Sequence, residues 1–312
     1  MRGKLGRMTR AHLPTGIELE YETFGSPADP ALLLVMGFTA QMILWADGFC
    51  ERLAAGGRFV IRYDNRDCGL SSKLDGVAVD GAAVMMAAMT GADVPAVPYT
   101  LSDMAADGIG LLDQLGIDRA HVVGASMGGM IVQTMAIEHA DRLLSVTSIM
   151  STVGDVAYGQ ASPESLTALL TPPPSDRAGA IERAAMSRVW ASKRYFDENV
   201  AKDYAARAFD RAFYPEGATR QLAAIFASGD RSAALREVTT PMLVIHGLDD
   251  NLIAPSGGRR TAELVPGAHL VEVADMGHDL PPPLWPFLAG AILGHQASAV
   301  ETTHAAPAEA VS

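Results

Sequence analysis

Short apolar runs alternate along this chain with stretches of helical periodicity, and this alternation limits the folds open to it. The apolar runs are typical of buried strands and stand at residues 31–37, 58–64, 120–124, 143–150 and 241–247. Apolar residues at helical spacing appear between them, as at residues 101–115. Parallel strands need a crossover connection, which is usually a helix. The pattern therefore predicts an α/β fold with a mostly parallel central sheet flanked by helices.

The rhythm changes over residues 155–237, a stretch rich in Ala, Arg and Asp with helical periodicity and the proline run TPPPS. Strand-like runs return after it. We therefore predict a helical cap insertion at residues 155–237 within an α/β core formed by residues 1–154 and 238–295. The remaining residues, 296–312, are mostly small or polar, and we predict a disordered tail there.

Composition excludes several classes of partner. The 312 residues are 49% hydrophobic and 19% charged, as in soluble globular proteins, and the net charge of −12 argues against a nucleic-acid partner. No apolar run approaches the roughly 18 residues that span a membrane, and no secretory apolar region follows the basic start, so we predict a cytoplasmic protein with no membrane partner. Cys50 and Cys68 form neither a disulfide framework nor a zinc-binding pattern, so no metal is expected.

A lone serine stands in a glycine-rich turn, Gly124-Ala125-Ser126-Met127-Gly128. The turn directly follows a predicted strand and opens a helical segment, which is the context of a nucleophile elbow. Glycines leave room around a serine held in a strained backbone conformation. A dinucleotide-binding loop is disfavoured, because its fingerprint needs glycine at position 126 and normally opens the first βα unit. A tight connection with an unused serine stays open.

A serine hydroxyl needs a base to become a nucleophile, and His278 is the best candidate. It lies just beyond the last predicted strand in a glycine-marked turn, as expected for the chain order serine, acid, histidine. His246 lies inside an apolar strand and is predicted to be structural. His121 and His269 begin their strands and are expected at the opposite end of the sheet from Ser126.

A carboxylate should orient this histidine. The segment after the penultimate strand offers Asp249 and Asp250, and we prefer Asp250. Asp249 is expected to organise the loop through hydrogen bonds to the backbone. Asp155 is the remaining candidate.

The segments ALLLVMG, VIRYDNRDCGLS, AHVVGASMGG, MLVIHGLDDNLIAP and MGHDLP occur in this order. Together they resemble the α/β-hydrolase fold, and in particular the aclacinomycin methylesterase-like branch of small bacterial esterases, over residues 17–293. The resemblance implies that the insertion is a cap over the active site and that the acid is Asp250. It also implies an oxyanion hole from the backbone amides of Phe38 and Met127. Met36-Gly37 stands where many relatives have His-Gly, which should leave the backbone donors in place.

Residues around these motifs also have expected roles. Asp64, Arg66 and Asp67 are expected to organise the core beside the elbow, and Cys68 is expected to be unreactive. For the methionines at 85, 86 and 89 we expect ordinary packing, and a role in lining an apolar substrate pocket stays open. The residues predicted to line a substrate pocket are Gly37, Trp45, Trp190 and Phe226.

These features predict a serine hydrolase that cleaves a carboxylic ester of a small, largely apolar molecule through an acyl-enzyme, without a cofactor. Lactone hydrolysis, carbon–carbon bond hydrolysis and cofactor-free perhydrolysis use the same triad and stay open. Dehalogenase chemistry is disfavoured, because its nucleophile is an aspartate. A non-enzymatic ligand receptor also stays open, as does the formation of a homo-oligomer.

Overall fold

The structure is a computed structural model that describes the backbone of residues 9–304 and the side chains of residues 9–299. One eight-stranded sheet runs through it in the order β1-β2-β4-β3-β5-β6-β7-β8. The strands are β1 (Thr9–His12), β2 (Glu18–Phe24), β3 (Ala31–Val35), β4 (Phe59–Tyr63), β5 (Ala120–Ala125), β6 (Leu143–Ile149), β7 (Met242–Gly247) and β8 (His269–Val273).

The six strands from β4 to β8 in this order are parallel, and β1 and β2 pair antiparallel at one edge. The predicted mostly parallel sheet is therefore confirmed. Val35 pairs with Gly124 and Ala125 with Ile149 near the carboxyl ends of their strands. The loops that follow β3, β5 and β6 consequently leave the sheet at one edge, where ligand sites of open α/β sheets lie.

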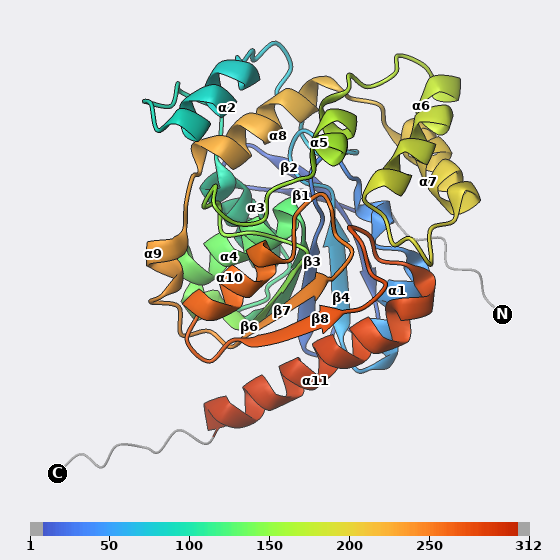
Figure 1. Ribbon diagram of the computed structural model, residues 1–312. Helices are drawn as coiled ribbons and strands as arrows, with labels where there is room; N and C mark the ends of the chain where they lie inside the picture. Colours follow the sequence, from blue (N-terminus) through green and yellow to red (C-terminus); the bar gives the residue numbers. More distant parts are fainter. Residues whose placement is uncertain (1–8, 305–312) are drawn as a thin grey trace.

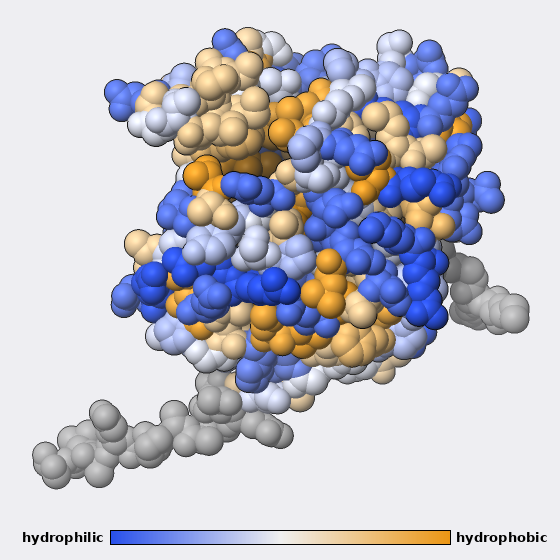
Figure 2. Space-filling model, in the orientation of Figure 1, coloured by the Kyte–Doolittle hydropathy of each residue, from blue (hydrophilic) through white to orange (hydrophobic). Residues whose placement is uncertain are grey.

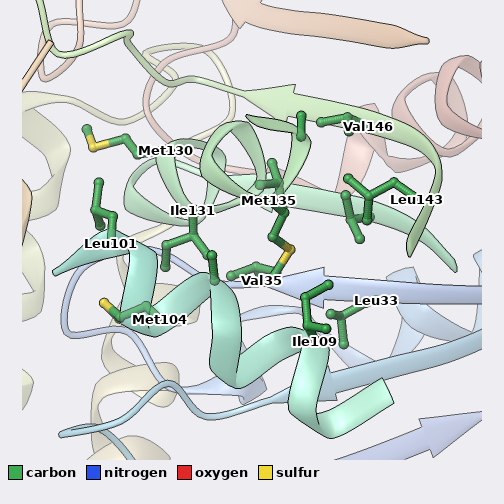
Figure 3. Close-up of a cluster of buried hydrophobic side chains, with 14 of the residues drawn as sticks. Leu33, Val35, Leu101, Met104, Ile109, Met130, Ile131, Met135, Leu143 and Val146 are labelled. Carbon is green, nitrogen blue, oxygen red and sulfur yellow. The ribbon is translucent and has the colours of Figure 1, made fainter. Parts of the chain in front are cut away.

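Helices cover both faces of the sheet (Figure 1). One core cluster packs the sheet against α3 (Leu101–Gln114), α4 (Met127–Glu138) and α10 (Ser256–Leu264), and Figure 3 shows part of it. A second cluster packs the other face against α1 (Asp47–Ala55) and α11 (Trp285–His304). Because the inner strands are buried on both faces, they consist of nearly continuous apolar residues.

The predicted insertion is helical. It contains α5 (Pro163–Leu170), α6 (Arg177–Arg183), α7 (Glu198–Arg211), α8 (Glu216–Ala227) and α9 (Ser232–Leu235). Helices α5 to α8 gather on one side of the molecule, together with α2 (Gly81–Thr90) (Figure 1). We use "cap" for residues 155–237; its boundaries with the core stay predictions.

Two buried ion pairs attach the cap to the turn after β4. Arg211 Nη1 lies 2.6 Å from Asp64 Oδ2, and Arg220 Nε lies 2.8 Å from Asp67 Oδ2. Both aspartate side chains are fully buried. Asp67 also accepts a hydrogen bond from the hydroxyl of Tyr99. The turn that the sequence analysis assigned to core organisation therefore also holds the cap.

Replacing Arg220 with methionine should lower the free energy of unfolding by about 3 kcal/mol, because it leaves the buried Asp67 carboxylate without its cation. Denaturant unfolding of the variant and the wild-type protein measures this difference. A surface control, Arg207→Met, breaks an exposed pair with Asp203 and should cost less than about 1 kcal/mol. Equal losses in the two variants would contradict the role of the buried pair.

The structure corrects several expectations of the sequence analysis. Met86 and Met89 on α2 are 59% and 61% exposed, whereas we expected them to pack. Residues 296–304 continue helix α11, whereas we predicted a disordered tail from residue 296. Leu288, Ala289 and Ile292 pack this helix against the second cluster, and Gln296 and Ala299 are also buried, so the packing that orders the helix continues past residue 296. Residues 305–312 of the predicted tail lie outside the described part of the chain. Strand β1 was not predicted, because TRAH has no apolar run.

Candidate active site

Ser126 lies at the sharp turn between β5 and α4. Its φ of 57° and ψ of −122° are strained for a residue with a side chain. The turn is held by the Ser126 amide, which donates to the Ile149 carbonyl at 3.0 Å, and by the Ser151 hydroxyl, which donates to the Ser126 carbonyl at 2.9 Å. Gly124 and Gly128 must both lack a side chain, because a Cβ on Gly124 would lie 2.0 Å from the carbonyl oxygen of Gly128, and a Cβ on Gly128 would lie 2.1 Å from that of Val35.

His278 and Asp250 form a hydrogen-bonded pair beyond the ends of β8 and β7. His278 Nδ1 lies 2.7 Å from Asp250 Oδ2. The other carboxylate oxygen accepts hydrogen bonds from the amides of Leu252 and Ile253, both at 2.9 Å. The carboxylate is thus held at both oxygens, which fixes the imidazole with Nδ1 facing the acid and leaves Nε2 for a substrate or nucleophile.

The pKa of Asp250 reflects opposing influences. Burial is the largest and acts to raise it, but the charge of His278 and hydrogen bonds from His246 and His278 outweigh burial and lower the pKa to about 2. The group is therefore a carboxylate at neutral pH, as an orienting acid must be.

His246 also contacts this carboxylate, which the sequence analysis did not predict. The residue is fully buried in β7, as its predicted structural role requires. Its Nε2 lies 2.8 Å from the carbonyl oxygen of Ile253 and 3.5 Å from Asp250 Oδ2. Through His246, strand β7 therefore contacts the loop that carries Asp250 at two points. The only sequence signal was a polar residue four positions before the acid.

The structure does not bring the other two carboxylate candidates to His278. Asp155 Oδ1 accepts from the amide of Ala157 at 2.9 Å. The amide of Asp249 donates to the Met276 carbonyl at 2.9 Å, and in the described part of the chain its carboxylate forms no ion pair with His278. Of the three, the structure brings only Asp250 to His278 among the residues it describes.

Ser126 and His278 belong to loops at the same edge of the sheet, but within residues 9–299 no hydrogen bond joins their side chains. Hydrogen bonds between nucleophile and base are often long without substrate and tighten in the complex. Ser126 is partly exposed, so its hydroxyl is accessible.

Gly37 places the loop after β3 against the serine. A Cβ built on Gly37 would lie 2.9 Å from the Cβ of Ser126. The next residue is Phe38, and in the described part of the chain no acceptor is hydrogen-bonded to the amide of Phe38 or of Met127. Both predicted oxyanion donors are therefore unpaired beside Ser126.

The predicted pocket residues separate into two groups. Trp45 is wholly buried in the second core cluster and stacks on Phe49 with ring centroids 5.8 Å apart, so its prediction as a pocket residue is wrong. Trp190 is half-buried, and its carbonyl accepts from the amide of His278 at 2.7 Å. Phe226 is half-buried on α8.

The cap also holds the loop that carries the histidine. Ser192 Oγ donates to Asp279 Oδ1 and accepts from the amide of Gly277 at 2.9 Å. A Cβ on Gly277 would lie 2.6 Å from the Ser192 amide nitrogen, so a larger residue there would push the cap away. The position of His278 therefore depends on the segment from Trp190 to Ser192.

The described residues contain no group of three or more His, Cys, Asp or Glu side chains placed to hold a metal ion. No helix among them is long and apolar enough to cross a membrane.

Comparisons with known proteins agree with this arrangement. The sequence model of the alpha/beta hydrolase fold matches residues 30–281. Rhodomycin D methylesterase DauP of Streptomyces sp. strain C5 is 32% identical over 93% of this chain and 99% of its own length. Rhodomycin D methylesterase DnrP of Streptomyces peucetius is 32% identical over 91% of this chain and 96% of its own.

A solved structure gives the same fold at lower identity. The enol-lactonase from Burkholderia xenovorans LB400 superposes with a TM-score of 0.70 at 24% identity, covering 93% of this chain and all of that one. The match of the family to most of the chain, together with the elbow between β5 and α4, shows that this chain belongs to the alpha/beta hydrolase fold family.

Proposed function

We propose that this protein is a serine carboxylesterase whose catalytic triad is Ser126, His278 and Asp250. The observation that carries the proposal is the buried Asp250–His278 pair, 2.7 Å apart, at the same sheet edge as the strained elbow of Ser126. The similarity to methylesterases along nearly the whole chain supports the reaction class.

In the first half-reaction, Ser126 Oγ attacks the ester carbonyl carbon and His278 Nε2 accepts the hydroxyl proton. The negative charge that develops on the carbonyl oxygen is stabilised by the amides of Phe38 and Met127. The bond to the alcohol oxygen then breaks, and His278 returns its proton to the leaving alcohol. The product of this step is an acyl-enzyme on Ser126.

In the second half-reaction, His278 takes a proton from water, and the resulting hydroxide attacks the acyl carbonyl. The tetrahedral intermediate collapses with protonation of Ser126 Oγ, which releases the carboxylic acid. Throughout, Asp250 keeps Nδ1 protonated and stabilises the imidazolium. This chemistry needs no cofactor.

We propose a methyl ester of a largely apolar acid as the substrate class. Two relatives are named as methylesterases. The face of the molecule in Figure 2 is hollowed beneath helix α8, and apolar residues gather in and around this hollow. Such a surface favours an apolar acyl group over a charged one.

A panel of substrates tests this proposal. It contains the methyl, ethyl and butyl esters of one aromatic acid, together with a lactone and a vinylogous diketone whose carbon–carbon bond is open to hydrolysis. We expect turnover of the esters, fastest for methyl, with one equivalent of acid released for each alcohol. Turnover of the lactone or the carbon–carbon substrate without ester hydrolysis would overturn it in favour of that sibling chemistry, and binding without multiple turnovers would favour a receptor.

A cytoplasmic location without a nucleic-acid partner stays part of the proposal and rests on the composition of the chain. Retention of the protein on immobilised DNA at moderate salt would contradict the absence of a nucleic-acid partner.

A further inference from the structure

A glutamine of the cap reaches the loop that carries Phe38. Gln221 lies on α8 and is 1% exposed. Its Oε1 accepts from the amide of Thr39 at 2.8 Å, and its Nε2 donates to the carbonyl of Arg66 at 2.9 Å. Both ends of this buried amide are thus used on backbone atoms of the core, one of them directly after the proposed oxyanion donor.

The loop needs such support because its backbone is strained. Thr39 has a φ of 57°, in the left-handed region that β-branched residues rarely adopt. Strained residues of this kind persist only where their surroundings hold them. The Ala40 amide donates to the Gly37 carbonyl at 3.3 Å, and the Thr39 amide donates to Gln221 Oε1. These two bonds set the peptide planes on either side of Phe38.

Helix α8, which carries Gln221, is itself held against the core by contacts with Asp67. The neighbouring Arg220 binds both oxygens of Asp67, at 2.8 and 3.0 Å. A Cβ on Gly217 would lie 2.9 Å from the Cβ of Asp67, so the first turn of the helix is packed directly on that loop. The glutamine therefore extends from a part of the cap that is fixed to the core.

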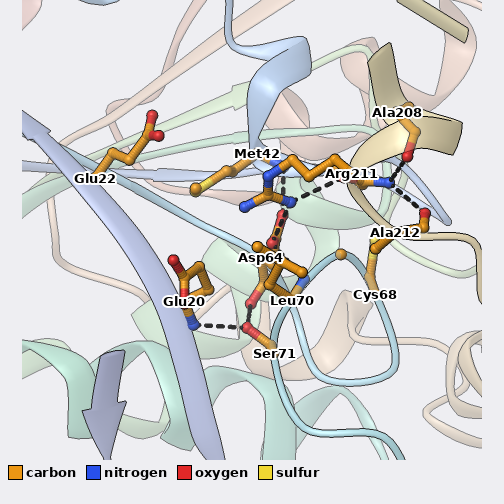
Figure 4. A network of polar contacts seen from close by, with 12 residues as sticks. Glu20, Glu22, Met42, Asp64, Cys68, Leu70, Ser71, Ala208, Arg211 and Ala212 are labelled. Atoms are coloured by element: carbon orange, nitrogen blue, oxygen red, sulfur yellow. Dashed lines mark hydrogen bonds and ion pairs between the residues drawn. The ribbon is translucent and has the colours of Figure 1, made fainter. Parts of the chain in front are cut away.

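The other end of the loop is held by helix α7. Gln41 Nε2 donates to the carbonyls of Ala208 and Ala212, at 2.7 and 2.8 Å. Arg211 donates to Gln41 Oε1 at 2.8 Å and to Asp64 Oδ2 at 2.6 Å, and Figure 4 shows it directed onto Asp64. The loop from Gly37 to Gln41 is thus bonded to the cap at both Thr39 and Gln41.

We infer that Gln221 is a positioning residue for the oxyanion hole: through the Thr39 amide it holds the Phe38 amide toward the developing negative charge. The inference rests on the proposed function. It makes the cap part of the catalytic machinery as well as a wall of the substrate site. Removing one oxyanion donor costs about 100-fold to 1000-fold in kcat, and displacing a donor without removing it should cost less, roughly 10-fold to 100-fold.

The test compares two variants of the full chain. Gln221→Met keeps the size of the side chain but loses both hydrogen bonds, and Gln221→Glu keeps the acceptor for Thr39. We expect Gln221→Met to lower kcat about 10-fold to 100-fold with KM within about threefold of wild type. The affinity for an aryl trifluoromethyl ketone, which forms a tetrahedral adduct with serine, should fall by the same factor as kcat. Gln221→Glu should recover most of kcat.

Arg207→Met is the matched control, because it breaks an exposed ion pair of the cap with Asp203 and contacts neither Gln221 nor the loop from Gly37 to Gln41. It should leave kcat within about threefold of wild type. If Gln221→Met does not fold, Gln221→Asn, whose amide is one methylene too short to reach Thr39, replaces it with the same expected result.

Unchanged kcat in folded Gln221→Met, or equal weakening of substrate and trifluoromethyl ketone binding, would overturn the inference. Equal loss of kcat in Arg207→Met would do so too, because it would show that kcat responds to any change in the cap. These outcomes differ from failure of the proposed function, in which the wild-type protein itself hydrolyses no ester.

Discussion

Ser126→Ala is expected to lower kcat for ester hydrolysis by roughly 10⁶-fold, the largest effect of any single substitution considered for this protein. The variant lacks the oxygen that forms the acyl-enzyme, whereas the oxyanion donors, Phe38 and Met127, use backbone amides that the substitution leaves in place. Residual activity from binding and the oxyanion hole should remain above the uncatalysed rate. Alanine also fits the strained φ of 57° no worse than serine, so the fold should persist. Initial rates with a nitrophenyl ester measure the effect.

The matched control is Ser102→Ala. Ser102 is a surface serine on α3 whose hydroxyl donates to Glu138, far from the elbow in the chain. The Ser102→Ala variant should hydrolyse the ester as fast as the wild-type protein. Retained hydrolysis in Ser126→Ala, at more than about one-hundredth of the wild-type rate, would exclude Ser126 as the nucleophile.

Asp250→Asn is expected to lower kcat by about 10⁴-fold while leaving the geometry of the site nearly unchanged. The asparagine amide offers His278 a donor or a neutral acceptor in place of the carboxylate, which favours the wrong tautomer and removes the charge that stabilises the imidazolium. Asp249→Asn is the control for the neighbouring carboxylate and should keep at least about half of the wild-type kcat. The reverse order of the two effects would show that Asp249 is the acid.

The same substitution should change the pH dependence of stability. Because the pKa of Asp250 is lowered to about 2 in the folded protein, its ionised form stabilises the fold above the unfolded pKa of about 3.9. This contribution is lost as the pH falls through the interval from about 4 to 2. Denaturant unfolding at several pH values should therefore show the difference between wild type and Asp250→Asn narrowing across that interval. A difference independent of pH would contradict the charged state assigned to Asp250.

Sequence patterns predicted the parts of this protein that depend on local order along the chain. The inner strands are apolar on both faces, so their runs were visible, and Ser126 stands directly after one of them. His278 lies five residues beyond β8, the edge strand, in the turn marked by Gly277. The sequence offered no physical reason to choose Asp250 over Asp249 as the acid, and the only support for that choice was the family resemblance. The structure adds the physical reason, which is the placement of Asp250 between two histidines.

The remaining features depend on tertiary contacts that no local pattern records. Trp45 was predicted to line the pocket, but its ring stacks on that of Phe49 in the core. Gln221 meets Thr39 across 182 residues of chain, and a single amide in a helix of the cap gives no signal of that contact.

The central claim is that Ser126 carries the acyl group, and one measurement tests it most directly. A fluorophosphonate modifies activated serines, and trypsin cleavage after Arg119 and Arg142 releases peptide 120–142, in which Ser126 is the only serine. Mass spectrometry should find one adduct per chain, on this peptide, in proportion to the loss of esterase activity. Complete inactivation with the adduct on any other peptide, or with peptide 120–142 unmodified, would contradict the account.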